Sequence, residues 1–216
     1  MPPKRFPAGP ARASEQTQAR ILDAAKVEFA RAGLSGARVD RIAELAGANK
    51  RMLYYYFGSK DGLFRAVLEA AYADIRESEK KLNLEAVDPV EAIRRLVAFS
   101  WRYHLGHPEF LSLLNTENMH RAEHIKQSTE VRSMHLPFVS MIDSILKRGV
   151  QTGVFRPGVD AIQLYISIAG LSYFYLSNND TLSAIFGRKL KSKKACDERL
   201  AHMTDVILGY LTYQKD

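Results

Sequence analysis

The sequence contains one cysteine, Cys196, one tryptophan and no apolar run long enough to cross a membrane. A lone cysteine excludes an intrachain disulfide framework and is typical of a reducing compartment. The missing apolar run excludes a transmembrane helix, and the N-terminus lacks the hydrophobic stretch of a signal peptide. We therefore expect a cytoplasmic protein with no membrane partner.

Strand patterns are also missing, because apolar and polar residues nowhere alternate over a sustained stretch. Apolar residues instead recur at helical spacing, which predicts an all-α chain. A first helix ends at Gly33, a residue suited to a helix C-terminus. The further predicted helices cover about 39–46, 50–57, 61–85, 89–104, 109–118, 129–149, 159–177 and 197–213.

The positive charge is unevenly placed. The chain carries a net charge of +7, and residues 1–60 hold eleven Lys and Arg against five Asp and Glu. Residues 61–216 hold twenty against nineteen, so this larger part is nearly neutral. A basic patch on an otherwise neutral molecule is typical of a nucleic-acid-binding module.

Residues 36–62 predict two short helices joined by a tight turn. Gly47 lies where the turn needs unusual backbone angles, and Asn49 is a good N-cap for the second helix. This is the build of a helix-turn-helix, whose second helix enters the DNA major groove. The side chains expected to meet bases or phosphates are Lys50, Arg51, Met52, Tyr54, Tyr55, Tyr56 and Lys60. One of the three tyrosines is expected to serve mainly in packing.

The segment is similar to the TetR/AcrR family of bacterial transcriptional regulators. The matching pattern occupies 21–25, 29–33, 42–47, 53–57 and 59–64, within about 17–72. The resemblance implies a homodimer of all-helical subunits, each with an N-terminal three-helix DNA-binding domain and a larger domain that binds a small ligand and dimerises. By position, Lys50, Arg51 and Met52 would contact bases, and Tyr55, Tyr56 and Lys60 would contact phosphates. Tyr54 would lie between bases and backbone.

The chain departs from the family at the start of the first motif helix. The family usually has Thr or Ser there, as a cap and a phosphate contact, where this chain has Ala37 and Arg38. Arg38 is expected to replace the phosphate contact with a charge-assisted one. The cap itself is expected to be weaker.

We therefore divide the chain into a disordered basic tail (1–13), a helix-turn-helix domain (14–60) and a helical ligand-binding and dimerisation domain (61–216). The tail contains several prolines together with Lys4, Arg5 and Arg12. Such a tail is either a floppy terminus or a basic arm that reaches a DNA groove.

Residues 162–176 are apolar on almost every face, which predicts a helix covered on both sides. The resemblance implies that the last two long helices form a four-helix bundle with the same pair of a partner. Burial within a monomeric core is the alternative. The matching stripe on the final helix is Met203, Val206, Ile207, Tyr210 and Leu211.

Candidate ligand contacts are polar or aromatic side chains on otherwise apolar inner helices. They are Trp101, Tyr103, His104, Phe110, Asn115, Asn118, Met134, Phe138, Tyr165 and Tyr173. The spacing of Glu117, His120 and His124 fits one helical face, but a solvated polar face is favoured over a metal site. The basic run at 188–194 is interpreted as a solvated connection, and no cofactor or metal is predicted.

These patterns favour a transcriptional repressor that binds a near-palindromic double-stranded DNA operator and is released by a small-molecule effector. A DNA-binding protein of the same fold without a ligand is the alternative. A helical enzyme is disfavoured, because no nucleophile–base pair, carboxylate pair or metal cluster stands out.

Overall fold

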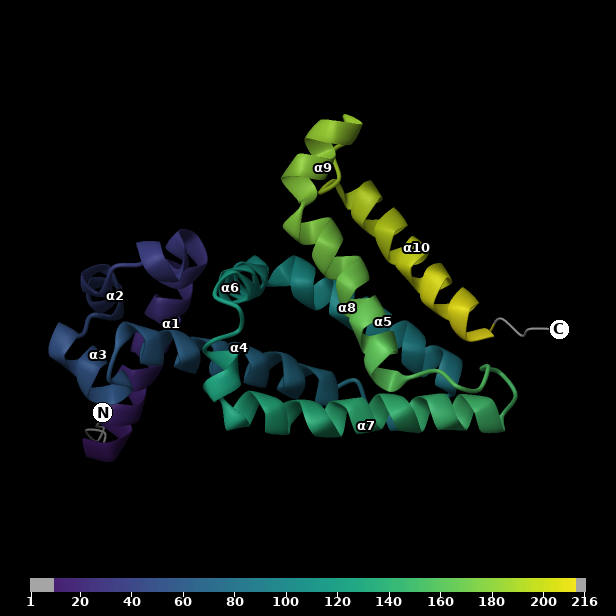
Figure 1. Cartoon of the computed structure of the whole chain (residues 1–216), viewed down its shortest axis with the longest axis horizontal. Helices are drawn as coiled ribbons and strands as arrows, with labels where there is room; N and C mark the ends of the chain where they lie inside the picture. The colour runs from purple at the N-terminus through teal and green to yellow at the C-terminus, as the bar shows by residue number, and fades with distance from the viewer. Residues whose placement is uncertain (1–9, 213–216) are drawn as a thin grey trace, which may run out of the picture. The chain divides into compact units, whose positions relative to one another are not determined.

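The computed structural model describes residues 10–212, with side chains from residue 14 onward. Over this range the chain forms α-helices and two short 3-10 helices without any strand, which confirms the all-α prediction (Figure 1). The α-helices are α1 (Pro10–Gly36), α2 (Val39–Ala46), α3 (Lys50–Phe57), α4 (Lys60–Lys80), α5 (Pro89–Gly106), α6 (Pro108–Met119), α7 (Thr129–Gln151), α8 (Ala161–Ser177), α9 (Asn179–Phe186) and α10 (Lys193–Thr212). The 3-10 helices are η1 (Leu84–Ala86) and η2 (Ile125–Gln127).

Some helix limits differ from the predicted ones. Helix α1 begins at Pro10, inside the predicted tail, because proline fits the first turn of a helix; residues 1–9 lie outside the described range. Helix α4 ends at Lys80 rather than near 85, since Asn83 takes a left-handed conformation with φ of 47° before η1. The predicted connection between 177 and 197 contains α9, whose end at Gly187 has φ of 61°.

The described chain divides into two compact units. Unit 1 comprises the chain through Ala71 together with Ser112–Ser128, and unit 2 comprises Tyr72–Leu111 and the chain from Thr129 onward. The predicted domain boundary at residue 60 falls at the start of α4, within unit 1. Helix α4 runs from unit 1 into unit 2, and its two halves therefore serve different cores.

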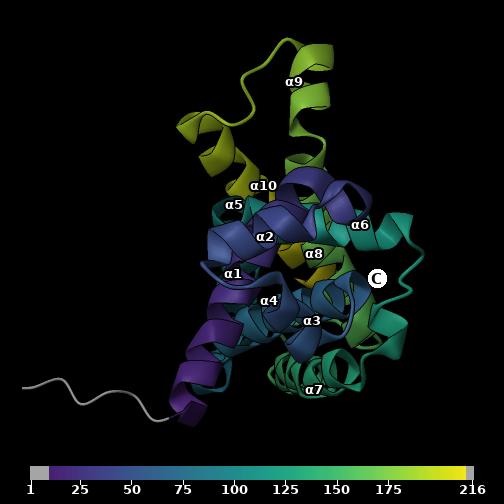
Figure 2. The ribbon, with the colours of Figure 1, turned by 90° about the vertical axis from the view of Figure 1, so that its left-hand side faces the viewer.

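Unit 1 is built on α1, against which both α2 and α3 pack (Figure 2). Its core is a set of fully buried side chains on α1, α2 and α4, in which the rings of Phe29 and Phe64 meet edge to face at 5.0 Å. Gly33 interrupts α1 with φ of 66°, as its predicted role at a helix end requires. Apolar burial from several helices thus holds the short pair α2–α3 in place.

Unit 2 is centred on α5, which contacts α7, α8 and α10. Its core includes Ile93 and Val97 from α5, Ile142 from α7 and Met203 from α10, all of them buried. Gly149 is required here, because a Cβ at that position would lie 1.9 Å from the ring of Phe155. The helix that opens at Pro89 is N-capped by Asp88, whose carboxylate accepts from the N–H of Glu91 at 3.0 Å.

Candidate functional site

The turn between α2 and α3 has the predicted geometry. Gly47 is left-handed, with φ of 56° and ψ of 38°, and its N–H donates to the carbonyl of Glu44 at 3.1 Å. Asn49 caps α3, since its Oδ1 accepts from the N–H of Arg51 at 2.9 Å. The first turn of α3 is thereby fixed relative to α2, as a helix-turn-helix requires.

The start of α2 is held by a residue that the sequence analysis missed. Arg38 is the N-cap and its side chain makes no capping bond, but its N–H donates to Oε1 of Glu28 at 3.3 Å. This buried carboxylate of α1 also pairs with Arg31 at 2.9 Å and Arg41 at 3.1 Å. Hydrogen bonding from Arg31 holds the pKa of Glu28 below its usual value. The available signal was a charged residue inside the apolar stripe that includes Ile21 and Ala25.

The outward face of α3 is polar, aromatic and basic. Tyr55 is 82% exposed and Tyr54 is 45% exposed. The side chain of Arg51 is exposed and makes no bond to another described residue. Lys50 is also exposed and forms an ion pair of 2.8 Å with Asp40 of α2. These four side chains form the outward α3 face, a solvent-facing surface that can donate to DNA.

The remaining predicted DNA contacts are partly engaged within unit 1. Met52 is half-buried, and the half-buried Tyr56 shares a hydrogen bond of 2.9 Å with the hydroxyl of Ser14. The ammonium of Lys60 donates to the carbonyl of Ala37 at 3.3 Å and to that of Ser35 at 3.5 Å. Lys60 therefore already binds oxygen atoms at the end of α1.

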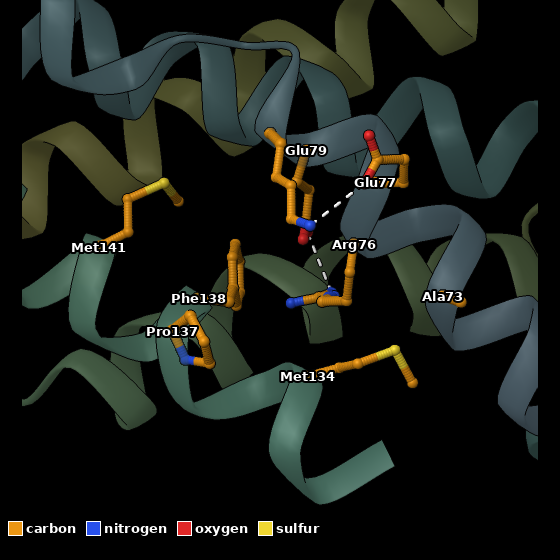
Figure 3. Close-up of a pocket in the computed structure, with 9 residues that line it drawn as sticks. Ala73, Arg76, Glu77, Glu79, Met134, Pro137, Phe138 and Met141 are labelled. Atoms are coloured by element: carbon orange, nitrogen blue, oxygen red, sulfur yellow. Dashed lines mark hydrogen bonds and ion pairs between the residues drawn. The ribbon is translucent and has the colours of Figure 1, made fainter. Parts of the chain in front are cut away.

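Unit 2 contains a cavity of about 450 Å³ between α4 and α7 (Figure 3). Its walls are largely apolar, and two glutamates, an arginine and a lysine from α4 add polar groups. The lining residues are Ala73, Arg76, Glu77, Glu79, Lys80, Met134, Pro137, Phe138 and Met141. A largely apolar cavity of this size with a few polar groups is typical of small-molecule sites.

A buried polar pair lies in this wall. Nη2 of Arg76 is 3.0 Å from Oε1 of Glu79, and each side chain is no more than 6% exposed. The guanidinium lies over the ring of Phe138, 4.0 Å from its centroid, as Figure 3 shows. Burial raises the pKa of Glu79 to about 8, although the positive charge of Arg76 acts in the opposite direction. Neither residue was among the sequence candidates, although both continue the inward stripe of α4 beyond Leu68.

Of the predicted ligand contacts, Met134 and Phe138 line the cavity. Tyr165 is not a lining residue, but its ring lies 5.3 Å from that of Phe138 and 5.7 Å from the guanidinium carbon of Arg76. Asn115 and Asn118 are exposed on the part of α6 that belongs to unit 1, and Tyr173 is half-buried on α8.

The other predicted contacts make bonds or ring contacts inside unit 2. The hydroxyl of Tyr103 donates to Asp74 at 2.6 Å, and Nδ1 of His104 lies 2.7 Å from the hydroxyl of Ser172. Burial lowers the pKa of His104 to about 4, so its ring is neutral at pH 7. Phe110 stacks on His104 at 5.9 Å, and Trp101 meets Tyr175 edge to face at 5.6 Å. These four side chains therefore already have bonding or ring partners within unit 2. Helical periodicity in the sequence does not reveal such partners.

The set Glu117, His120 and His124 does not form one helical face, because α6 ends at Met119 and only Glu117 lies on it. The expected solvated face is wrong for Glu117 and His124, which are buried in unit 1. Glu117 accepts from Nδ1 of His124 at 2.7 Å and from the N–H groups of His124 and Ile125 at 2.8 and 2.9 Å. Nδ1 of His120 bonds to the carbonyl of Thr116 at 2.8 Å. Residues 10–212 contain no group of three His, Cys, Asp or Glu arranged to hold a metal ion. In the same range, every helix is too short or too polar to cross a bilayer.

Comparisons with known proteins agree with this geometry. Residues 21–67 match the family described as bacterial regulatory proteins, tetR family, and residues 89–207 match the tetracyclin repressor-like C-terminal domain. The chain is 40% identical to the HTH-type transcriptional repressor NicS of Pseudomonas putida, over 92% of this chain and 93% of that protein. It is 38% identical to the HTH-type transcriptional repressor SCO4008 of Streptomyces coelicolor, over 74% and 79% of the two chains.

The fold is similar to that of the regulator FadR from Bacillus subtilis, solved in complex with stearoyl-CoA. The TM-score is 0.65 at 15% identity, and the match covers 89% of this chain and 98% of that one. The matched families span both the helix-turn-helix and the cavity-bearing unit, and the relatives extend over most of the chain. The chain therefore belongs to the TetR family of bacterial regulatory proteins and is a DNA-binding transcriptional regulator.

Proposed function

We propose that this regulator is a repressor that binds a near-palindromic operator as a homodimer and leaves it when a small effector occupies the unit 2 cavity. The observation that carries the proposal is the extent of α4. The helix begins at Lys60, next to the recognition helix, and its last turns bring Arg76 and Glu79 into the cavity wall. One continuous helix therefore joins the two functions.

The outward α3 face supports direct DNA contact. Arg51 and Tyr55 are exposed, so among the residues with described side chains no hydrogen bond competes there with a base edge or a phosphate. Lys50 must exchange Asp40 for DNA, which costs little because an exposed ion pair contributes about 0–1 kcal/mol. Met52 would touch a thymine methyl, and Tyr54 would lie between bases and backbone.

The more enclosed residues would hold the sugar-phosphate backbone. Lys60 at the start of α4 joins a positive charge to the N-terminal amides of a helix, a combination that favours phosphate. Tyr56 would add its hydroxyl after releasing Ser14, and Arg38 would reach a phosphate beside α2. Phosphate contacts set the position of the domain, and the base contacts set the sequence.

An exposed apolar face on α8 and α10 supports the dimer. Repressors of this family are dimers, and this chain leaves Ile166 and Phe174 of α8 and Tyr210 of α10 exposed. Together with Val206 they border a groove between the two helices. The apolar surround predicted for residues 162–176 would be completed by the same helix pair of a partner.

The effector would act through α4. Because α4 contributes Lys60 to unit 1 and Arg76 to the cavity wall of unit 2, a change in α4 at the cavity is the proposed route to the DNA-binding unit. Release requires that the effector bind the non-DNA-binding conformer more tightly, because a ligand shifts an equilibrium only by its differential affinity. A cavity with unpartnered polar atoms favours this proposal over the ligand-independent alternative, which predicts a filled interior.

DNA duplexes selected from random sequence by the purified protein test the DNA-binding part. Lys60→Gln is expected to weaken binding to all selected sequences and to lower the slope of log affinity against log salt by about 0.9. Arg51→Gln is expected to relax the preference at one base position by about 1–3 kcal/mol. Lys189→Gln, an exposed lysine of the basic run, is the matched control and should change neither quantity. Equal effects of all three substitutions would contradict the assignment.

A further inference from the structure

The cavity wall contains polar atoms that have no partner. Within residues 10–212, Nε and Nη1 of Arg76 and Oε2 of Glu79 are buried and make no hydrogen bond of ordinary geometry. Tyr165 is the nearest polar neighbour: burial raises the pKa of its hydroxyl and Arg76 opposes that rise. Buried donors and acceptors are nearly always paired, because an unpaired one costs about 1–3 kcal/mol. Five other described side chains each leave one buried atom unpaired, whereas here three such atoms gather on Arg76 and Glu79 in the wall of one cavity. This grouping is what favours a bound molecule that completes their bonding.

The free donors of Arg76 have a defined shape. A guanidinium carries five N–H groups in one plane, and Glu79 occupies only Nη2, at 3.0 Å. One edge of the plane carries the Nε–H beside one Nη2–H, and the next edge carries an Nη1–H beside the other Nη2–H. A ligand can therefore accept two parallel N–H bonds on the edge that Glu79 does not use. This fork matches the two oxygens of a carboxylate.

The charge of the wall favours an anion. Burial raises the pKa of Glu79 to about 8, so at pH 7 this group is mostly a neutral acid beside a permanent cation. The buried positive charge of Arg76 is then uncompensated, and the free Oε2 carries a proton that it can donate. Lys80, the other cation of the wall, is already paired with Glu77 at 3.2 Å. One buried positive charge fits a monoanion better than a phosphate dianion.

The rest of the cavity favours an apolar ligand body. Phe138 presents a ring beneath the guanidinium, and the thioethers of Met134 and Met141 form the walls on either side (Figure 3). Thioethers adapt their shape and make favourable contacts with aromatic rings. A volume of about 450 Å³ is suited to a small molecule rather than to a long chain.

We propose that the cavity binds a small monocarboxylic acid with an apolar body, whose carboxylate accepts from the free edge of Arg76 and whose body lies on Phe138 between the two methionines. The identification of this acid as the effector rests on the proposed function. Glu79 acts as a positioning residue, because it holds Nη2 and turns the other edge toward the ligand.

Matched pairs of acids and primary amides test the ligand class: benzoate with benzamide, phenylacetate with phenylacetamide and octanoate with octanamide. Binding to the full chain without DNA is measured by calorimetry and by thermal shift. At least one acid is expected to bind with a Kd below about 1 mM, and at least tenfold more tightly than its amide, since a charge-assisted pair is replaced by neutral bonds. Equal binding of every acid and its amide, or no acid binding in this range, would overturn the proposal.

Variants locate the site. Arg76→Gln should remove the preference for the acid, and the exposed Arg94→Gln is the matched control that should keep it. Met141→Trp fills the cavity and should abolish binding of acids and amides alike, with an unchanged dimer mass and helical content. If Arg76→Gln keeps the tenfold preference, the carboxylate lies elsewhere and the proposal is wrong.

The same ligands are then added to the protein–DNA complex, which separates the two proposals. If an acid binds through Arg76 but leaves the DNA affinity unchanged, the proposal that the effector releases DNA is refuted. The proposal that the cavity binds a monocarboxylic acid would stand. If an amide releases DNA and binds Arg76→Gln as well as it binds the wild type, the proposal of effector release would stand. The proposal that the ligand is a carboxylic acid held by Arg76 would be overturned.

Discussion

Glu28 of unit 1 and Glu79 of unit 2 are both buried glutamates on helices, and the two are treated in opposite ways. Glu28 of unit 1 is paired with Arg31 and Arg41 and accepts the N–H of Arg38, and its pKa is lowered. Glu79 of unit 2 has one partner and a bare Oε2, and its pKa is raised to about 8. A saturated carboxylate serves the fold, whereas an unsaturated one beside a cavity is available to a ligand. The difference is the one that the proposed function requires between a DNA-binding unit and a ligand-binding unit.

The strongest test of this comparison removes the saturated carboxylate. Glu28→Ala leaves two arginines and the N–H of α2 without their shared acceptor. Breaking a buried pair typically costs about 3–5 kcal/mol, and the half-exposed arginines recover part of it from water, so we expect a loss of about 3 kcal/mol. Urea denaturation at pH 7 measures it. A loss below about 1 kcal/mol would show that Glu28 is not structurally important.

The second test concerns pH and acts in the opposite direction. The pKa of Glu79 is raised on folding, so the stability this group contributes is present below about pH 4.5 and is lost as the pH rises toward about 8. Glu79→Gln removes that loss. The variant should match the wild type near pH 5 and exceed it by about 4 kcal/mol near pH 8.5, since each pH unit between pH 5 and the folded pKa of about 8 corresponds to about 1.36 kcal/mol. The unfolding midpoints in urea at the two pH values measure the difference.

An opposite result is equally informative. If Glu79→Gln is less stable than the wild type at pH 8.5, an ionised Glu79 stabilises the fold through Arg76. The two glutamates would then play the same structural role, and the contrast between the units would fail.

In unit 1, individual residue roles could be predicted from the sequence where a residue acts on its near neighbours in the chain. Gly47 and Asn49 act within three residues of their positions, so the turn and the cap follow from the sequence. The role of Glu28 was not predicted, because Glu28 and Arg38 are ten residues apart in the sequence and their hydrogen bond joins α1 to the start of α2. Helical periodicity does not reveal a contact of this kind. The missed α9 is a short helix whose first turn is polar, so it was interpreted as part of a loop.

The cavity of unit 2 was less predictable, and the reason is physical. Tyr103 and His104 have the residue types expected of a ligand site, but Asp74 and Ser172 already satisfy them. Arg76 resembles one more charged residue of a long helix, and its unpartnered atoms become visible only when the packing around it is known. A sequence shows which side chains can bind a ligand; it does not show which of them the fold leaves without a partner.

The smallest expected effect compares the two helix caps of unit 1. Asn49 caps α3 with its own side chain, so Asn49→Ala should cost about 1 kcal/mol of stability. Arg38 occupies the same position on α2, yet the acceptor for its N–H is Glu28, so Arg38→Ala should change stability by no more than about 0.5 kcal/mol. Urea denaturation of both variants at pH 7 measures these changes. The double variant Glu28→Gln with Arg38→Ala should equal Glu28→Gln alone, because the bond uses only the backbone of residue 38. A loss for Arg38→Ala as large as that for Asn49→Ala would mean that the Arg38 side chain itself stabilises α2, and that the borrowed carboxylate does not replace the missing cap.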